Sequence, residues 1–290
     1  MLVRISISLQ IIHYFCKKKE MTDNPEITML GTGNAMVTKC YNTCFSIKTG
    51  KGYFLVDAGG GNGILSQLEK AEIDSEQIRG MFVTHGHTDH ILGAIWIIRI
   101  MAMLASQGKL KEPFIIYCHN EVKQMLDIFC QLTLKNKHLD TFGKEIIIQT
   151  VRDGEKAICC DIDFTFFDIH STKKKQFGFR ATLPDRQTLA CLGDEPYNEK
   201  CRKFVEGCDW MMHEAFCLYA DKDKFQPYEK HHSTALDAAK AAESLKIKNL
   251  IIYHTEDSDL AHRKVNYTAE ASIAFKGHIF VPDDMETITI

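Results

Sequence analysis

The sequence lacks the features that would divide it into separate modules. Only six of its 290 residues are proline, and the chain shows no proline-rich hinge, low-complexity linker or internal repeat. Its formal net charge is −3, so an overall positive field that would attract nucleic acid is missing too, although a local basic groove is not excluded. A chain of this length can bury a substantial core. We therefore expect a single domain over residues 21–290.

The eleven cysteines are not arranged as a disulfide framework. No C-x-x-C occurs, and the closest pair is Cys159-Cys160, within a strand-like run. Cysteines scattered through apolar runs are typical of reduced, buried thiols in a cytosolic protein. The sequence therefore predicts a cytoplasmic location.

The first twenty residues lack the order of a secretory signal. The apolar run from Leu2 to Cys16 comes before the lysines at 17–19, whereas a signal peptide carries its positive charge first. The run is also too short to span a bilayer. Because Met21 directly precedes the first strand-like segment, we expect residues 1–20 to be a tail or an upstream-start artefact, and we expect no stable membrane association.

The glycine-rich turns lack a nucleotide-binding motif. Gly31-Thr32-Gly33 follows an expected strand, but the third glycine of G-x-G-x-x-G would fall at Met36, and no helix pattern follows. Walker A spacing is absent as well. Both this turn and Gly59-Gly60-Gly61 are more typical of loops whose backbone approaches a site closely.

Short apolar runs that alternate with helical periodicity predict a layered α/β fold. Strands are expected at 26–30, 44–48, 53–56, 80–84 and 114–117, and helices at 63–70, 91–106 and 121–134. Residues 145–192 are expected to form an antiparallel meander, after which strands and helices alternate again. Two sheets built partly from hairpins and partly from strand–helix units predict a sandwich with helices outside.

What the sequence does contain is a dense group of metal-binding side chains. The stretch His85-Gly86-His87-Thr88-Asp89-His90 follows an expected strand and holds three histidines and one aspartate. Imidazole and carboxylate suit zinc, iron or manganese. His85 and His87, two apart in a loop, can converge on one ion. Asp89 and His90 begin the next helix and must point elsewhere, which predicts a second ion and further ligands downstream.

Three later strands end in such ligands. His170, Asp194 and His254 each follow an expected strand directly or within two residues. Sites in layered α/β proteins lie just beyond the carboxyl ends of strands. One strand-terminal histidine indicates little, but three positions together with a complete H-x-H-x-D-H indicate a shared metal centre.

With these residues, the chain over 26–290 resembles the metallo-β-lactamase superfamily. The resemblance implies that superfamily's four-layer αβ/βα sandwich, in which two mixed sheets carry helices outside. It also implies two divalent metal ions, zinc before manganese or iron. Its ligand set corresponds to His85, His87 and His170 for the first ion and to Asp89, His90 and His254 for the second. Asp194 would bridge the ions, and Asp57 would support the ligands from behind.

Within the superfamily, the chain is most similar to the ribonuclease Z group. The similar segments are Met212-His213-Glu214-Ala215-Phe216, His232-Ser233-Thr234-Ala235 and Phe177-Gly178-Phe179-Arg180. In that group a histidine at the His232 position, hydrogen-bonded to an acidic residue, assists the leaving group. The resemblance thus implies His232 and Glu214 as catalytic residues. Asp89 could also accept the proton of the nucleophile.

Departures from the group's pattern concern the substrate. Only fifteen residues separate Gly178 from Asp194, which leaves no room for the tRNA-gripping arm that the group inserts there. The loop 37–42 keeps an asparagine but lacks the usual proline and arginine, and Glu195 stands where a threonine is usual. The spacer after His170 is slightly longer. These departures weaken the case for tRNA processing and leave the metal chemistry intact.

The sequence therefore predicts a dinuclear metal-dependent hydrolase, most of all a ribonuclease Z-like phosphodiesterase acting through a metal-bound hydroxide. A small-molecule or nucleotide phosphodiester is the expected substrate, while a tRNA substrate and a homodimer stay open. The alternatives are a hydrolase of a carbon ester, thioester or lactam, and a non-hydrolytic metal-binding or oxidoreductase protein. The run Lys173-Lys174-Lys175 either holds an anionic substrate or is simply solvated. No substrate-binding residue is assigned.

Overall fold

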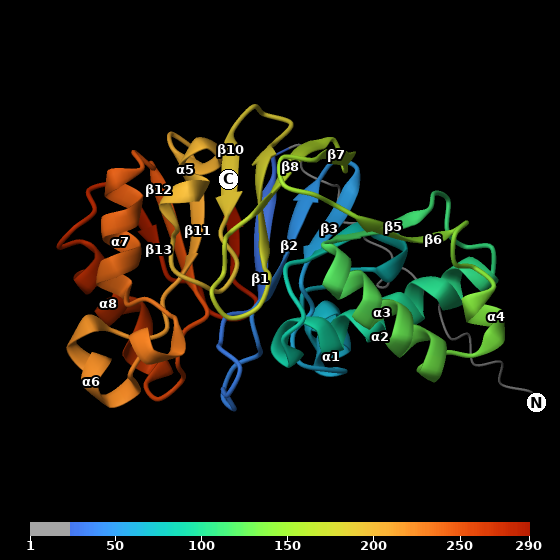
Figure 1. Ribbon diagram of the computed structural model, residues 1–290, viewed down its shortest axis with the longest axis horizontal. Coiled ribbons are helices and arrows are strands. Elements are labelled where there is room, and N and C mark those ends of the chain that lie inside the picture. Colours follow the sequence, from blue (N-terminus) through green and yellow to red (C-terminus); the bar gives the residue numbers. More distant parts are fainter. Residues whose placement is uncertain (1–23) are drawn as a thin grey trace, which may run out of the picture.

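Two seven-stranded sheets form the centre of the computed structural model, which describes residues 24–290 (Figure 1). The prediction for residues 1–20 lies outside the described residues. The first sheet, in spatial order, comprises β14 (Thr287–Thr289), β1 (Glu26–Gly31), β2 (Cys44–Thr49), β3 (Gly52–Val56), β4 (Ile78–Val83), β5 (Phe114–Cys118) and β6 (Ile146–Thr150). The second comprises β13 (His278–Phe280), β12 (Asn249–Tyr253), β11 (Trp210–Glu214), β10 (Thr188–Cys191), β9 (Phe177–Thr182), β8 (Ile162–Asp168) and β7 (Lys156–Cys159).

Helices cover the outer faces of both sheets (Figure 1). The first sheet carries α1 (Gly63–Lys70), α2 (Thr88–Ser106), α3 (Asn120–Thr133) and α4 (Asn136–Leu139). The second is accompanied by α5 (Arg202–Val205), α6 (Lys222–Phe225), α7 (Ala235–Ser244) and α8 (Leu260–Ala271). Single 3₁₀ turns lie at Ser75–Gln77, Glu199–Cys201, Tyr219–Asp221 and Tyr228–Lys230. This arrangement confirms the predicted α/β sandwich of two mixed sheets.

Aromatic side chains fill the space between the two sheets. Phe54 of β3 packs on Phe164 of β8 with ring centroids 4.4 Å apart. Phe82 of β4 packs on Phe166 in the same way, at 4.9 Å. All four side chains are at most 1% exposed. Burying such large apolar surfaces stabilises the contact between the sheets and so fixes the strand ends on either side of it.

Two further apolar layers attach the helices to the sheets. The layer under α2 and α3 contains Ile97 and Leu126, and the layer under α7 and α8 contains Ala239 and Tyr267. Helix α2 is long and apolar enough to cross a membrane by length and composition, and it is the one such helix among residues 24–290. Its most apolar window is 61% buried against the protein, and core helices of water-soluble proteins meet the same criterion.

One prediction about the middle of the chain was wrong. Strand β6 does not start an antiparallel meander: it pairs in parallel with β5, where Phe114 lies opposite Ile146. The meander begins only at β7, in the other sheet. The reason is the intervening α3, because a strand–helix–strand crossover returns the chain parallel to its starting strand. The apolar pattern of Ile146–Thr150 is the same for either partner, so periodicity could not distinguish them.

The carboxyl ends of five strands meet at one edge of the sandwich. Strands β3 and β4 run parallel in the first sheet, as do β10, β11 and β12 in the second. Asp57 after β3 and His254 after β12 leave their strands in the left-handed conformation, with φ of 54° and 59°. Aspartate and histidine tolerate this region better than most residues. The two turns bring both side chains back toward the same edge.

Candidate metal centre

Strand β4 and helix α2 deliver the first four candidate ligands. His85 is completely buried, and its Nε2 lies 2.9 Å from Nδ1 of His87. Asp89 and His90 lie in the first turn of α2, where the carboxylate also interacts favourably with the helix dipole. Nε2 of His90 is 3.3 Å from Oδ2 of Asp89.

Helix α2 can approach this edge closely because residue 93 is a glycine. A Cβ at that position would lie 1.8 Å from the carbonyl oxygen of Ala58, so any other residue would push the helix away. Instead the backbone N–H of Gly93 donates to the carbonyl of Gly59 at 2.8 Å. The contact fixes the start of α2, and with it His90, against the turn after β3.

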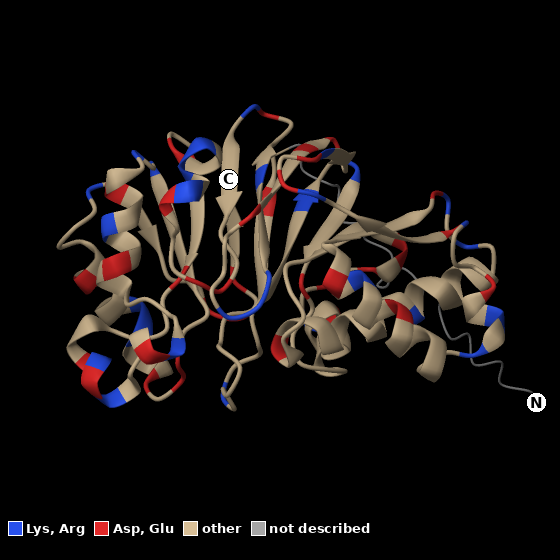
Figure 2. Ribbon diagram, viewed as in Figure 1, with Lys and Arg blue, Asp and Glu red and all other residues tan. Residues whose placement is uncertain are grey.

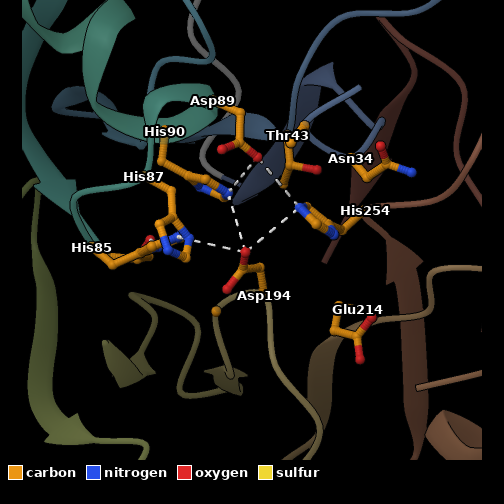
Figure 3. Close-up of polar contacts among 12 residues, drawn as sticks. Asn34, Thr43, His85, His87, Asp89, His90, Asp194, Glu214 and His254 are labelled. Carbon is orange, nitrogen blue, oxygen red and sulfur yellow. Dashed lines mark hydrogen bonds and ion pairs between the residues drawn. The ribbon is translucent and has the colours of Figure 1, made fainter. Parts of the chain in front are cut away.

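Asp194 joins the two halves of the cluster. Its Oδ2 lies 3.5 Å from Nε2 of His85, 3.6 Å from Nε2 of His90 and 3.7 Å from Nε2 of His254. Figure 3 shows these contacts meeting at Asp194. His254 also faces Asp89, at 3.6 Å. Residues from both sheets therefore converge on one carboxylate.

The cluster fits divalent metal ions. Two groups of side chains share Asp194, and within each group the potential ligand atoms lie within 4.8 Å of one another: Asp89, His90, Asp194 and His254 in the first, and His85, His87 and Asp194 in the second. A third group of this kind, Glu214, His232 and His254, lies beside them. Within residues 24–290, several buried atoms of the cluster have no hydrogen-bond partner: Nε2 of His90, Oδ1 of Asp194 and both ring nitrogens of His254. Leaving buried polar atoms unpaired is costly. Coordination to cations by Oδ1 of Asp194 and by Nε2 of His90 and His254 would satisfy these three atoms.

The two carboxylates of the cluster are held in their charged form. Burial alone would raise the pKa of Asp194, but His85 and His254 lower it well below its usual range. Burial likewise opposes ionisation of Asp89, yet His90 and His254 hold its pKa far below the ordinary value. Ionised carboxylates are the form that binds metal ions.

The surroundings shift the pKa values of the cluster's histidines in opposite directions. Burial lowers the pKa of His87 to about 4 and also lowers that of His254. For His90, burial works in the same direction, but the carboxylates of Asp89 and Asp57 raise the pKa well above its usual value. A cation that binds Nε2 of His90 must therefore displace a proton, and we expect metal affinity to fall as the pH is lowered.

Asp57 fixes the ring orientation of histidines in both groups. It accepts hydrogen bonds from the backbone N–H and the hydroxyl of Thr84 and from Nδ1 of His90, each at 2.8 Å. Because the Thr84 hydroxyl proton points to Asp57, Nδ1–H of His85 donates to the Thr84 oxygen at 2.9 Å. Both histidines are thereby left with Nε2 facing the cluster, and the supporting role of Asp57 stays a prediction.

Replacing Asp57 with asparagine is expected to weaken metal binding by about 10–100-fold, the usual cost of losing a hydrogen-bond partner of a metal-binding side chain. The amide would present one acceptor where the carboxylate serves three donors, so His90 and His85 would lose their fixed tautomers. Competition with a chromogenic chelator measures the affinity directly. An Asp57→Asn protein that binds metal as tightly as the wild type would contradict this role.

His232 and Glu214 form a second cluster beside the first. The Glu214 side chain is fully buried, and its Oε1 accepts the backbone N–H of Ser233 at 2.6 Å. Oε2 lies 3.5 Å from Nδ1 of His232. The His232 ring is 5.1 Å from the His254 ring and stacks on Phe216, also at 5.1 Å. The structure thus places both predicted catalytic residues next to the candidate metal ligands.

The structure does not bring His170 to the cluster. Its backbone has φ of 59°, its N–H donates to Oδ1 of Asp168 at 2.7 Å, and its side chain is exposed. It lines a neighbouring cavity together with Thr172, Tyr197 and His231. The strand end was predicted correctly, but a turn of the backbone after β8 directs the ring elsewhere. As a ligand of the first ion, His170 stays a prediction.

A cavity of about 520 Å³ opens over the cluster and includes residues that were not predicted as site residues. Its walls contain Asn34, Met36, Phe216, Lys173 and Lys230 in addition to the candidate ligands. The sequence offered a signal for Lys173, as part of the lysine run, and for Phe216, as part of the segment after β11. For Asn34 and Met36 the only signal was the preceding glycine turn, which was expected to approach a site, and for Lys230 there was none.

Fold and site together define a class: the metal-dependent hydrolases of the metallo-β-lactamase superfamily, of ribonuclease Z-like type. The chain is 26% identical over 275 residues to a ribonuclease Z of Phocaeicola vulgatus, with 79% of this chain and 86% of that protein covered. Residues 25–280 match the family described as Anti-Pycsar protein Apyc1, and the chain belongs to that family.

Solved structures show the same fold. The metallo-β-lactamase fold protein YhfI from Bacillus subtilis superposes with a TM-score of 0.71 at 20% identity, covering 92% of this chain and 100% of that one. The short form of human tRNase Z gives a TM-score of 0.69 at 19% identity, covering 91% and 99%. The likeness extends over nearly the whole length, so it includes both sheets.

Proposed function

We propose that the protein is a phosphodiesterase whose site holds two divalent cations, zinc before manganese or iron. The observation that carries the proposal is the position of Asp194, whose carboxylate belongs to both groups of candidate ligands. The second support is the adjacent pair of His232 and Glu214. A paired cation site beside a buried proton donor suits in-line displacement at phosphorus.

Each side chain would then have a defined task. Divalent cations bound there would supply Lewis-acid polarisation and lower the pKa of a coordinated water toward neutrality. Asp89, facing the cavity, would accept the proton of the attacking water. His232 would give a proton to the leaving alkoxide, while Glu214 orients the ring through Nδ1. Asp57 would keep His90 and His85 in the tautomer that suits binding.

We propose a small or cyclic phosphodiester, such as a nucleotide, as the substrate. Strands β9 and β10 are joined only by the tight turn 183–187, which leaves no gripping arm at that position. The cavity over the cluster is lined by two lysines, Lys173 and Lys230, which suits an anionic molecule of limited size. The ten described cysteines are all free, which supports the predicted cytoplasmic location.

A comparison of substrates with the metal-loaded full chain tests the function. Turnover of bis(p-nitrophenyl) phosphate and of a cyclic mononucleotide is expected, with little cleavage of a precursor tRNA. His85→Ala should lose the activity, since it removes a ligand from the cluster. Thioester or lactam turnover without any diester turnover would overturn the proposal in favour of carbon-centred hydrolysis.

A further inference from the structure

Departures from the ribonuclease Z pattern meet in one place in the structure. They are the lengthened loop between β8 and β9, which contains the lysine run, and Glu195. Figure 2 shows the run as a continuous blue segment where the loop crosses the edge at which the two sheets present their strand ends. Glu195 follows Asp194 directly, and its side chain is almost buried, at 8% exposure.

The Glu195 carboxylate contacts three side chains of this loop. Its Oε1 accepts the hydroxyl of Ser171 at 2.6 Å and the side-chain amide of Gln176 at 3.5 Å. The ammonium of Lys173 lies 3.9 Å from the same oxygen. The two hydrogen bonds fix the start and the end of the loop, and the charge attracts the lysine between them. A threonine in place of Glu195 would be shorter and uncharged. It could not bond to both Ser171 and Gln176 and also attract Lys173.

The three lysines of the run have different surroundings. Lys173 lines the cavity over the metal cluster, and its Nζ donates to the carbonyl of Lys230 at 3.0 Å. Lys174 runs past Gly86, where a Cβ would lie 3.2 Å from its Cε. Lys175 turns away, with its Nζ bonded to Oδ1 of Asn120 at 3.0 Å. Lys173 is thus the member of the run that faces the cavity.

Lys173 keeps free capacity for a ligand. An ammonium has three donors. The Lys230 carbonyl takes one, and Oε1 of Glu195 at 3.9 Å lies beyond hydrogen-bond distance. Its side chain is 22% exposed, so water screens its charge less than it would on the open surface. Lys230 adds a second positive charge to the same cavity, with its Nζ 4.7 Å above the Phe216 ring.

We propose that Lys173 is a substrate-binding residue that donates to a phosphoryl oxygen beside the metal ligands, and that Glu195 is the positioning residue that holds this ammonium over the cavity. The inference rests on the proposed phosphodiesterase function and identifies the positively charged side chain that binds its substrate. A charged hydrogen bond of this kind favours anionic substrates and phosphate-bearing products over neutral esters.

The matched variants Lys173→Met and Lys175→Met test the first part in the metal-loaded full chain. Methionine keeps most of the side-chain length and removes the charge. Lys173→Met should weaken the binding of inorganic phosphate, measured by calorimetry, by about tenfold, and raise KM for bis(p-nitrophenyl) phosphate to a similar extent with kcat little changed. Phosphate binding should also depend less steeply on salt concentration. Lys175→Met should behave as the wild type, and Lys173→Arg should recover part of the affinity.

A double-mutant cycle tests the role of Glu195. Glu195→Gln keeps the hydrogen-bonding shape but removes the charge, so it should raise KM by less than Lys173→Met does. In the double variant the two effects should not add, because Glu195 acts through the lysine. Additive effects would overturn the positioning role.

Unchanged phosphate affinity in Lys173→Met, or an equal loss in Lys175→Met, would overturn the assignment of the binding residue. Phosphate binding does not require turnover. A wild-type protein that binds phosphate through Lys173 but cleaves no diester would therefore contradict the proposed function and not this assignment.

Discussion

Asp194→Asn is expected to lower kcat for a phosphodiester by about 10³-fold or more, and to reduce the metal content of the purified protein. The carboxylate lies within 3.7 Å of three buried histidines and belongs to both candidate ligand groups. Asparagine removes its charge and one ligand oxygen. Loss of several kcal/mol of transition-state stabilisation corresponds to a rate loss of that size. Steady-state kinetics together with elemental analysis measure both effects.

Asp185→Asn is the matched control, because it makes the same chemical change in the exposed turn between β9 and β10. It should leave kcat and metal content as they are. Retention of full activity and two bound ions in Asp194→Asn would show that this carboxylate does not join the two groups.

His232→Ala is expected to slow cleavage according to the leaving group. For a diester that releases an alkoxide, the loss should be about 10²–10⁴-fold, the usual contribution of a general acid. For bis(p-nitrophenyl) phosphate the loss should be much smaller, because p-nitrophenolate leaves without a proton. Metal content should stay at the wild-type level, since His232 is in neither candidate group that contains Asp194 but in a third one, with Glu214 and His254.

The neighbouring histidine provides the control for this experiment. His231 is exposed and bonded through Nδ1 to the Thr172 hydroxyl at 2.8 Å, so His231→Ala should keep the activity toward both substrates. An equal loss for both leaving groups in His232→Ala would contradict a role in proton transfer and indicate a structural role for the ring.

The proximity of the first four candidate ligands was predictable because they are neighbours in the sequence. Four ligands within six residues can hardly be separated by folding, and the helix that begins at Thr88 orients Asp89 and His90 by its own geometry. Asp194 and His254 were accessible through a rule, since both follow buried strands. The same rule located His170 at a strand end but could not give the direction of its side chain, which depends on one backbone turn.

Contacts between distant loops were not predictable from the sequence. Glu195 could be recognised as a departure and the lysine run as a possible anion-binding segment, but nothing in the sequence places Lys173 at 3.9 Å from Glu195. The partner of β6 was missed for a related reason, because strand pairing is a property of the whole sheet. Local patterns specify which elements form, and the packing of the two sheets decides which side chains meet.

Titration of the metal-free full chain with a divalent cation tests the central claim most directly. Turnover of bis(p-nitrophenyl) phosphate is recorded after each addition of Zn²⁺, and in parallel with Mn²⁺. We expect no turnover before metal is added. The rate should reach a plateau only at about two equivalents of metal per chain, because the carboxylate of Asp194 belongs to two candidate ligand groups. Turnover by the metal-free chain, or a plateau at one equivalent, would contradict a paired metal centre.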